Sequence, residues 1–141
     1  MLRSVTVAAV LSFFVFGAVA DNAKVIKKVP TSPTSPSSGK EMFGTYCAVC
    51  HGKDGKGSGP AASALKKTPA DLTTLTGRNN GKFPELRMYS TIQGDSETVA
   101  HGSRDMPVWG NVFQEMSRGS SGEVQMRISN LISYVQTMQV K

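Results

Sequence analysis

Cysteine and histidine are both scarce in this chain, which has two of each among its 141 residues. Two cysteines are too few for the disulfide framework that holds many small exported domains together. Charged residues make up only 18% of the chain, whereas apolar residues reach 39%. This balance excludes a disordered or fibrous protein and, at this length, predicts one globular domain. The formal net charge of +6 is too moderate to select nucleic acid, an anionic membrane or an acidic protein as the partner.

The apolar run near the N-terminus is too short to cross a membrane. Arg3 precedes an apolar stretch over 5–16, and a spanning helix needs about 20 residues. Ala18 and Ala20 then supply the small-x-small pattern of a signal-peptidase site. We therefore expect residues 1–20 to be a signal peptide that exports the protein to the periplasm or another extracytoplasmic space.

Residues 21–38 are rich in proline, serine and threonine. Spaced prolines among hydroxyl residues favour an extended, unpacked tether, so we interpret this stretch as a flexible linker. Three lysines, at positions 24, 27 and 28, leave open a contact with membrane headgroups, although so few charges favour a simple tail. The folded domain is then expected over 39–141.

A helix is predicted to begin at Ser38, which forms a capping-box pattern with Glu41. The residues that recur after it on one helical face are Phe43, Tyr46, Cys47 and Cys50. The pattern stops at Gly52, and four glycines between 52 and 59 indicate a loop. No strand precedes this loop and its spacing fits no phosphate-binding motif.

Further helices are predicted over 60–65, from Pro84 to a stop at Gly94, and from a second capping box at Ser120. The residues expected inside the second of these are Leu86, Tyr89 and Ile92. Those of the last are Val124, Ile128, Leu131, Val135 and Met138. No segment alternates long enough to predict a strand, so the fold class is all-α, with long loops at 66–83 and 94–119. Such loops around few helices leave a thin core, and a haem would fill it.

Cys47, Cys50 and His51 form the haem attachment pattern C-x-x-C-H. Cysteines three residues apart project from one side of a helix, so both sulfurs reach the two vinyl groups on one porphyrin edge. The imidazole of His51 then lies beneath the ring, where neutral imidazole is a common iron ligand.

Two other sites use the same residues. A thioredoxin-like dithiol lies at the start of a helix in a βαβ unit, whereas Cys47 is expected two turns into a helix with no strand nearby. A zinc ion would need four ligands, nominally Cys47, Cys50, His51 and His101. Adjacent Cys50 and His51 point in different directions, which disfavours zinc.

From about Gly39 to Lys141 the chain resembles a class I monohaem cytochrome c of the compact bacterial type. The resemblance rests on the attachment motif, on Gly59-Pro60 after it, on the Asp105–Gly110 loop with its Met106-Pro107 pair, and on the 131–135 stretch of the last helix. It implies one covalent haem c bound by Cys47 and Cys50. The tail at 21–38 lies outside it.

The resemblance also implies further site residues. His51 and Met106 would be the axial iron ligands, and the Pro60 carbonyl would accept the second N–H of the His51 ring. Met106 precedes a proline in a loop, which stiffens it, while the other methionines lack that context. His101 is the competing sixth ligand.

For three more residues, two roles each are possible. Trp109 packs in the core or contacts a haem propionate, with core packing favoured. Arg78 and Arg104 either neutralise propionates or lie in solvent.

Filled axial positions leave no site for a substrate, so the expected function is electron transfer rather than catalysis. Lysines 53, 56, 66 and 67 either steer acidic redox partners to the haem edge or form a solvated face. No nucleic-acid partner is expected. Two alternatives remain: a cytochrome subunit of a larger periplasmic oxidoreductase, and a haem sensor or peroxidase with an open sixth position.

Overall fold

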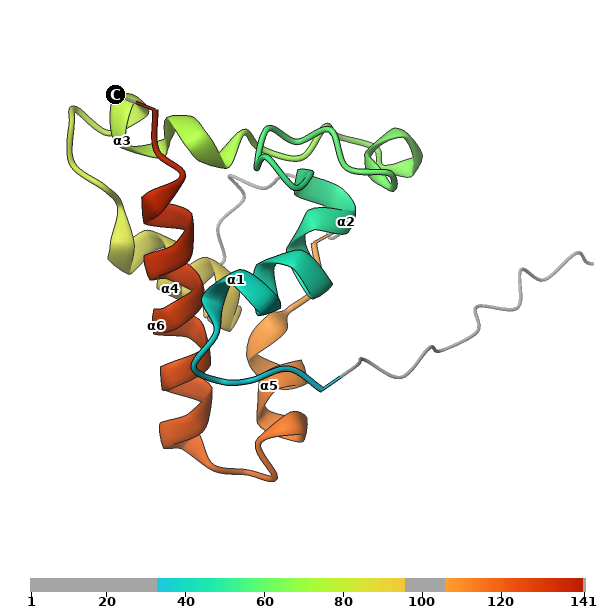
Figure 1. Ribbon diagram of the computed structural model, residues 1–141, viewed down its shortest axis with the longest axis vertical. Coiled ribbons are helices and arrows are strands. Elements are labelled where there is room, and N and C mark those ends of the chain that lie inside the picture. The colour runs from blue at the N-terminus through green and yellow to red at the C-terminus, as the bar shows by residue number, and fades with distance from the viewer. Residues whose placement is uncertain (1–32, 96–105, 141) are drawn as a thin grey trace, which may run out of the picture. The chain divides into compact units, whose positions relative to one another are not determined.

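The computed structural model describes residues 33–95 and 106–140, which form helices and loops (Figure 1). None of these described residues lies in a β-strand, which confirms the all-α fold class. No helix in this part of the chain has both the length and the apolar character that a membrane crossing requires. The predicted signal peptide, most of the linker, His101 and Arg104 lie outside the described residues.

The first helical segment runs without a break through α1 (Gly39–Met42), the π-helical turn η1 (Phe43–Cys47) and α2 (Ala48–His51). Ser38 caps it as predicted, because its hydroxyl accepts the N–H of Glu41 at 3.2 Å. The wider turn of η1, closed by the Ala48 N–H on the Phe43 carbonyl, inserts one extra residue in the turn that ends at Cys47. The segment ends at Gly52, where φ is +78°.

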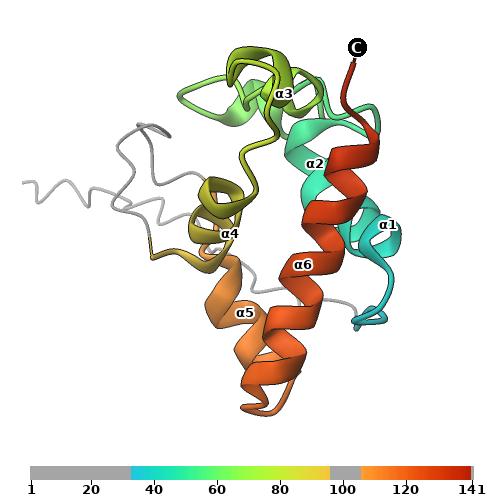
Figure 2. The same cartoon turned by 90° about the vertical axis from the view of Figure 1, so that its left-hand side faces the viewer.

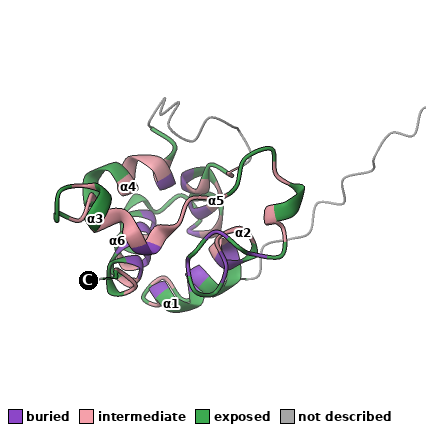
Figure 3. Ribbon diagram, turned by 90° about the horizontal axis from the view of Figure 1, so that it is seen from above, coloured by how far each residue is buried: buried purple, intermediate pink, exposed green. Residues whose placement is uncertain are grey.

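Helix α6 (Ser121–Thr137) crosses this first segment, and the two pack together (Figures 1 and 2). The crossing depends on Gly39, because a Cβ there would lie 2.0 Å from the Asn130 carbonyl oxygen of α6. The Ser120 hydroxyl caps α6 by accepting the N–H of Glu123. Four residues of the predicted apolar stripe are buried, as expected: Val124, Ile128, Leu131 and Val135. Figure 3 shows this buried face beside the buried parts of α1 and α5.

Helix α4 (Glu85–Gln93) follows Pro84 and ends at Gly94 in the left-handed conformation, as predicted. Ile92 is buried, but the side chain of Leu86 is 84% exposed. The expectation that Leu86 points inward is therefore wrong. The expectations for the other two residues are confirmed, because Ile92 belongs to the core and Tyr89 packs against it, as does Met88.

Both segments that were expected to be long loops contain short helices that had not been predicted. In 66–83 lie η3 (Leu72–Thr74) and α3 (Leu75–Arg78), and in 94–119 lies α5 (Trp109–Met116). The Asp71 carboxylate caps η3 by accepting the Thr73 N–H at 2.8 Å. Helices η3 and α3 are too short to show a periodic apolar pattern. In α5, by contrast, Trp109, Val112, Phe113 and Met116 recur at helical spacing, and the interpretation of the sequence overlooked this pattern. The helix expected over 60–65 is reduced to a 3₁₀ turn, η2 (Ala62–Ala64).

Residues 34–38, which we call the N-terminal clasp, pack onto the domain rather than forming the end of an unpacked linker. Thr34 is only 7% exposed. Its backbone carbonyl accepts a hydrogen bond from the buried guanidinium of Arg127, and the Pro36 carbonyl accepts one from Asn130. These residues pack with the domain because donors on α6 require the Thr34 and Pro36 carbonyls as acceptors.

Candidate cofactor cleft

A cleft with about 860 Å³ of empty volume, part of it open to solvent, lies between α4, α6 and the first helical segment. We call that segment, which covers residues 39–51 and carries the two cysteines, the attachment segment. Most of its walls are apolar side chains. Its lining residues are Phe43, Tyr46, Cys47, Cys50, His51, Ala70, Leu72, Leu75, Pro84, Arg87, Met88, Thr91, Ile92, Met106, Pro107, Trp109, Leu131 and Val135.

Cys47, Cys50 and His51 all line this cleft, as the attachment motif predicts. Both cysteines are half-buried free thiols. Burial, with a smaller contribution from neighbouring Cys50, raises the pKa of the Cys47 thiol to about 12. Cys47 is therefore a neutral thiol at physiological pH, held at an apolar wall. The two sulfurs and the imidazole come from one short helical segment and share one side of the cleft.

The ring of His51 is oriented by a backbone carbonyl. Its Nδ1 atom lies 3.0 Å from the carbonyl oxygen of Ala70. A carbonyl oxygen only accepts, so Nδ1 carries the proton and Nε2 keeps its lone pair. The prediction that Pro60 supplies this acceptor is wrong: Pro60 is exposed, and Ala70 makes the contact ten residues later.

The glycine loop at 52–59 places Ala70 against His51. Gly57 adopts a φ of +84°, and a Cβ there would lie 2.2 Å from the carbonyl oxygen of Pro69. The Leu72 N–H donates to the Gly55 carbonyl at 2.7 Å, and the Gly57 N–H donates to the His51 carbonyl at 2.7 Å. The loop therefore connects His51 to the segment 69–72 through backbone contacts, and these contacts leave no room for a side chain at position 57.

Met106 and Pro107 line the same cleft as His51, on the segment that leads into α5. This places the predicted sixth ligand at the cofactor cleft. Met88 also lines the cleft, from α4. The competing ligand His101 falls outside the described residues.

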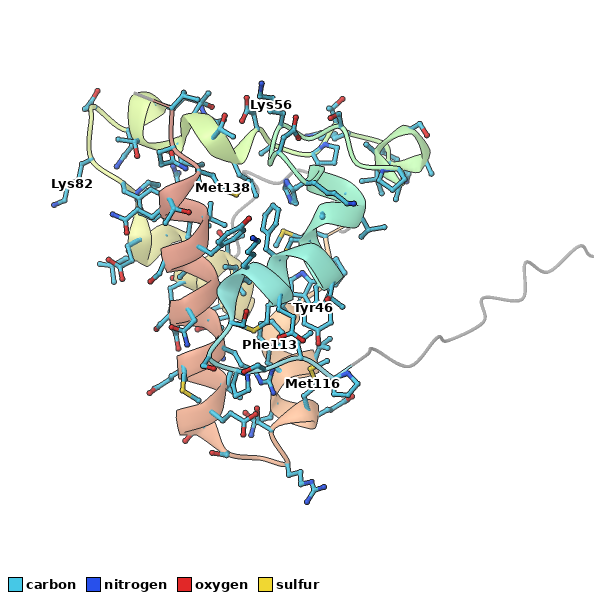
Figure 4. The ribbon with its side chains drawn as sticks, in the orientation of Figure 1. Tyr46, Lys56, Lys82, Phe113, Met116 and Met138 are labelled. Atoms are coloured by element: carbon cyan, nitrogen blue, oxygen red, sulfur yellow. The ribbon has the colours of Figure 1, made fainter. Side chains whose placement is uncertain are left out.

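Trp109 packs in an aromatic cluster, as expected. Its ring centroid lies 5.3 Å from that of Tyr46 and 5.9 Å from that of Phe113. The tilted geometry is typical of aromatic pairs in protein cores. Figure 4 shows Tyr46, Phe113 and Met116 close together between the first helical segment and α5. Trp109 also reaches the cleft, so it serves as both core and cleft wall.

Arg87 was missed by the sequence interpretation. It is the one lysine or arginine that lines the cleft within the described residues. Arg78, a predicted propionate partner, instead donates to the Asp71 carbonyl and is not part of the lining. Arg87 directly precedes Met88 on α4, a helix for which the sequence predicted only the inward residues Leu86, Tyr89 and Ile92.

The two rival interpretations of the cysteines find no support in the structure. No strand adjoins the attachment segment among the described residues, so the βαβ context of a dithiol oxidoreductase is absent there. Within the same residues, no three His, Cys, Asp or Glu side chains are arranged to hold a metal ion by themselves.

The cleft fits a haem by the chemistry of its residues. Two thiols share one wall with an imidazole that is oriented through its Nδ1 atom, a thioether stands on the segment before α5, and the remaining walls are mostly apolar. Thiols, imidazole and thioether are the groups that bind and ligate haem in c-type cytochromes.

Comparison with known proteins gives one match. Residues 34–119 match the family described as cytochrome c oxidase, cbb3-type, subunit III. No curated protein and no solved structure matches the chain. The family match begins at the N-terminal clasp and confirms a class I c-type cytochrome domain with covalent haem c. It thereby confirms electron transfer as the general function.

Proposed function

This chain belongs to the cbb3-type cytochrome c oxidase subunit III family, and we propose that Cys47, Cys50, His51 and Met106 hold its haem. The observation that carries the proposal is that all four side chains line one cleft. When bound, the haem supplies an iron that alternates between the ferrous and ferric states. The protein residues attach, orient and enclose that group.

Cys47 and Cys50 fix the cofactor to the attachment segment through two thioether bonds. His51 presents Nε2 because Ala70 holds the Nδ1 proton. A hydrogen bond from Nδ1 makes the imidazole more electron-rich, which favours the ferric state and lowers the reduction potential. Gly57 acts on the ligand by allowing the segment 69–72 to approach.

Met106 occupies the sixth position in this proposal. The following Pro107 restricts the Met106 backbone and stiffens the segment that carries the thioether. A soft, neutral thioether favours ferrous iron and raises the potential, in opposition to His51. With His51 and Met106 holding the iron, the haem would transfer electrons and would offer no coordination position to a substrate.

Arg87 supplies positive charge at the edge of an otherwise apolar cleft. Haem carries two carboxylates, and guanidinium is the side-chain group best matched to a carboxylate. We assign Arg87, in place of Arg78, as the residue that compensates a propionate. Its charge also opposes oxidation of the iron, which adds positive charge to the cofactor.

The redox partner in this proposal is acidic. Residues 52–87 contain seven lysines or arginines but only three aspartates or glutamates. The lysines at 53, 56, 66 and 67 are exposed, and the same stretch supplies cleft residues from Ala70 to Arg87. Figure 4 shows Lys56 and Lys82 at the same end of the domain. Such a surface steers acidic partners and makes association sensitive to salt.

A second function is favoured by the family match, whose description names a subunit of an oxidase. The chain would then pass electrons within a permanent extracytoplasmic complex after removal of residues 1–20. Gel filtration of a native extract separates the two functions: a free carrier elutes near its own mass, whereas a subunit co-elutes with partner chains.

The visible spectrum of protein made with haem-attachment machinery tests the site. Covalent haem retained after denaturation and a weak far-red sulfur-to-iron band are the expected results. Haem that extracts into acidic organic solvent would refute the roles of Cys47 and Cys50. A ferrous protein that binds carbon monoxide at once would refute a filled sixth position. Intact mass of the exported chain, expected to start at Asp21, tests the signal peptide.

A further inference from the structure

A buried polar network joins the N-terminal clasp (residues 34–38) to the wall of the cleft. The hydroxyl groups of Thr34 and Tyr46 lie 2.9 Å apart in a buried hydrogen bond. The Tyr46 hydroxyl also donates to the sulfur of Met116 at 3.6 Å. The ring of the same tyrosine lines the cleft. Tyr46 thus has its ring at the cofactor site and its hydroxyl in the network.

Arg127 on α6 anchors the clasp. Its side chain is only 6% exposed, yet it is charged. One terminal nitrogen donates to the Thr34 carbonyl at 2.9 Å and contacts the Thr34 hydroxyl at 3.3 Å. The other pairs with the Glu123 carboxylate at 2.8 Å. Burial of a guanidinium is tolerated only when its donors are satisfied, so the position of Thr34 is set by Arg127.

We propose that Arg127 is a positioning residue for the haem site, acting through Thr34 on the Tyr46 ring. In this proposal the clasp is part of the structure that binds the cofactor, because it holds Tyr46 in place at the cleft. With Thr34 in place, the Tyr46 ring is held between the cleft and the rings of Trp109 and Phe113. A fixed ring keeps water from that wall, and an apolar, dry wall disfavours the more highly charged ferric state.

The inference rests on the proposed haem function and makes a separate prediction. Thr34→Val and Tyr46→Phe each remove one side of the same hydrogen bond and leave the surrounding shape nearly unchanged. We expect both variants to attach haem normally and to lower the midpoint potential by similar amounts. The double variant should lower the potential by less than the sum of the two single variants, because both substitutions break the same Thr34–Tyr46 hydrogen bond.

Two control variants make the same chemical changes away from the network. Thr137→Val removes an exposed hydroxyl that donates to its own helix. Tyr134→Phe removes the hydroxyl of a tyrosine whose ring packs on Phe43. Both should keep the wild-type potential. Arg127→Lys keeps the charge but loses the forked geometry, and it should lower the potential as Thr34→Val does.

Potentials measured by spectroelectrochemistry on the full holoprotein decide between the outcomes. Unchanged potentials in Thr34→Val and Tyr46→Phe would overturn the inference, as would effects that add in the double variant. Hydrogen exchange at the amides of 34–38 gives a second readout and should increase in Arg127→Lys. Failure of the unmodified chain to attach haem would instead refute the proposed function.

Discussion

Substitution of Gly57 by alanine tests how the loop controls the histidine ligand. The residue has a φ of +84°, and holding a non-glycine residue in the left-handed region costs about 1–2 kcal/mol. The new Cβ would also lie 2.2 Å from the Pro69 carbonyl oxygen, so this contact must open to 3.0 Å or more. That movement pulls the neighbouring Ala70 carbonyl from His51, at a further cost of about 0.5–1.5 kcal/mol for the lost hydrogen bond.

We therefore expect Gly57→Ala to reduce the free energy of unfolding by about 1.5–3.5 kcal/mol, from the left-handed backbone and the lost hydrogen bond together. The potential should rise, because an imidazole that has lost its Nδ1 partner donates less charge to ferric iron. Gly81→Ala is the matched control: its φ is +79°, but no heavy atom lies within 4 Å of the added Cβ. It should show only the cost of the left-handed backbone, about 1–2 kcal/mol, with no change in potential.

Guanidinium titration and spectroelectrochemistry on the holoproteins measure the two quantities. Equal destabilisation in both variants would show that the approach of Pro69 to Gly57 costs nothing. An unchanged potential in Gly57→Ala, with the larger destabilisation present, would show that the Ala70 contact does not tune His51. Either result refutes the argument.

Three further outcomes are expected. Met106→Ala should abolish the far-red sulfur-to-iron band and lower the potential, whereas Met88→Ala should keep the band; the reverse would make Met88 the ligand. Arg87→Gln should lower the potential in redox titration and Arg78→Gln should not, because only Arg87 lines the cleft; equal shifts would contradict the assignment. Hydrogen bonds from Arg127 and Ser117 lower the pKa of Glu123, so its stabilising effect is present above its unfolded-state pKa and is lost as pH falls through the folded-state value. Glu123→Gln should therefore reduce the loss of stability between pH 7 and pH 3, as measured by thermal melts. A loss equal to that of the wild type would contradict this.

The attachment motif was predictable because its chemistry is local. Cys47, Cys50 and His51 lie within five residues on one helical segment, so their spacing alone places them together. The caps at Ser38 and Ser120 were predictable for the same reason, since each involves a partner three residues away. These features need no knowledge of the tertiary fold.

The parts that sequence analysis missed are long-range and made by the backbone. The acceptor for His51 is a carbonyl 19 residues away, and a carbonyl has no side-chain signature to reveal it. Thr34 was assigned to a flexible linker because its composition is that of a linker. Its burial depends on Arg127, which is 93 residues away and whose need for acceptors appears only once α6 is in place.

The glycine loop shows how a local sequence pattern and a long-range backbone contact combine. Its four glycines indicate a loop that is not a phosphate cradle, but they do not say what approaches them. In the structure, the backbone of 69–72 approaches Gly57 and Gly55, and this approach delivers a carbonyl to the histidine ligand. In the proposed site, the motif determines which residue is the ligand, and a backbone contact that only glycine permits would determine how strongly that ligand donates electrons. Two chains with the same attachment motif can then differ in potential through one glycine outside it.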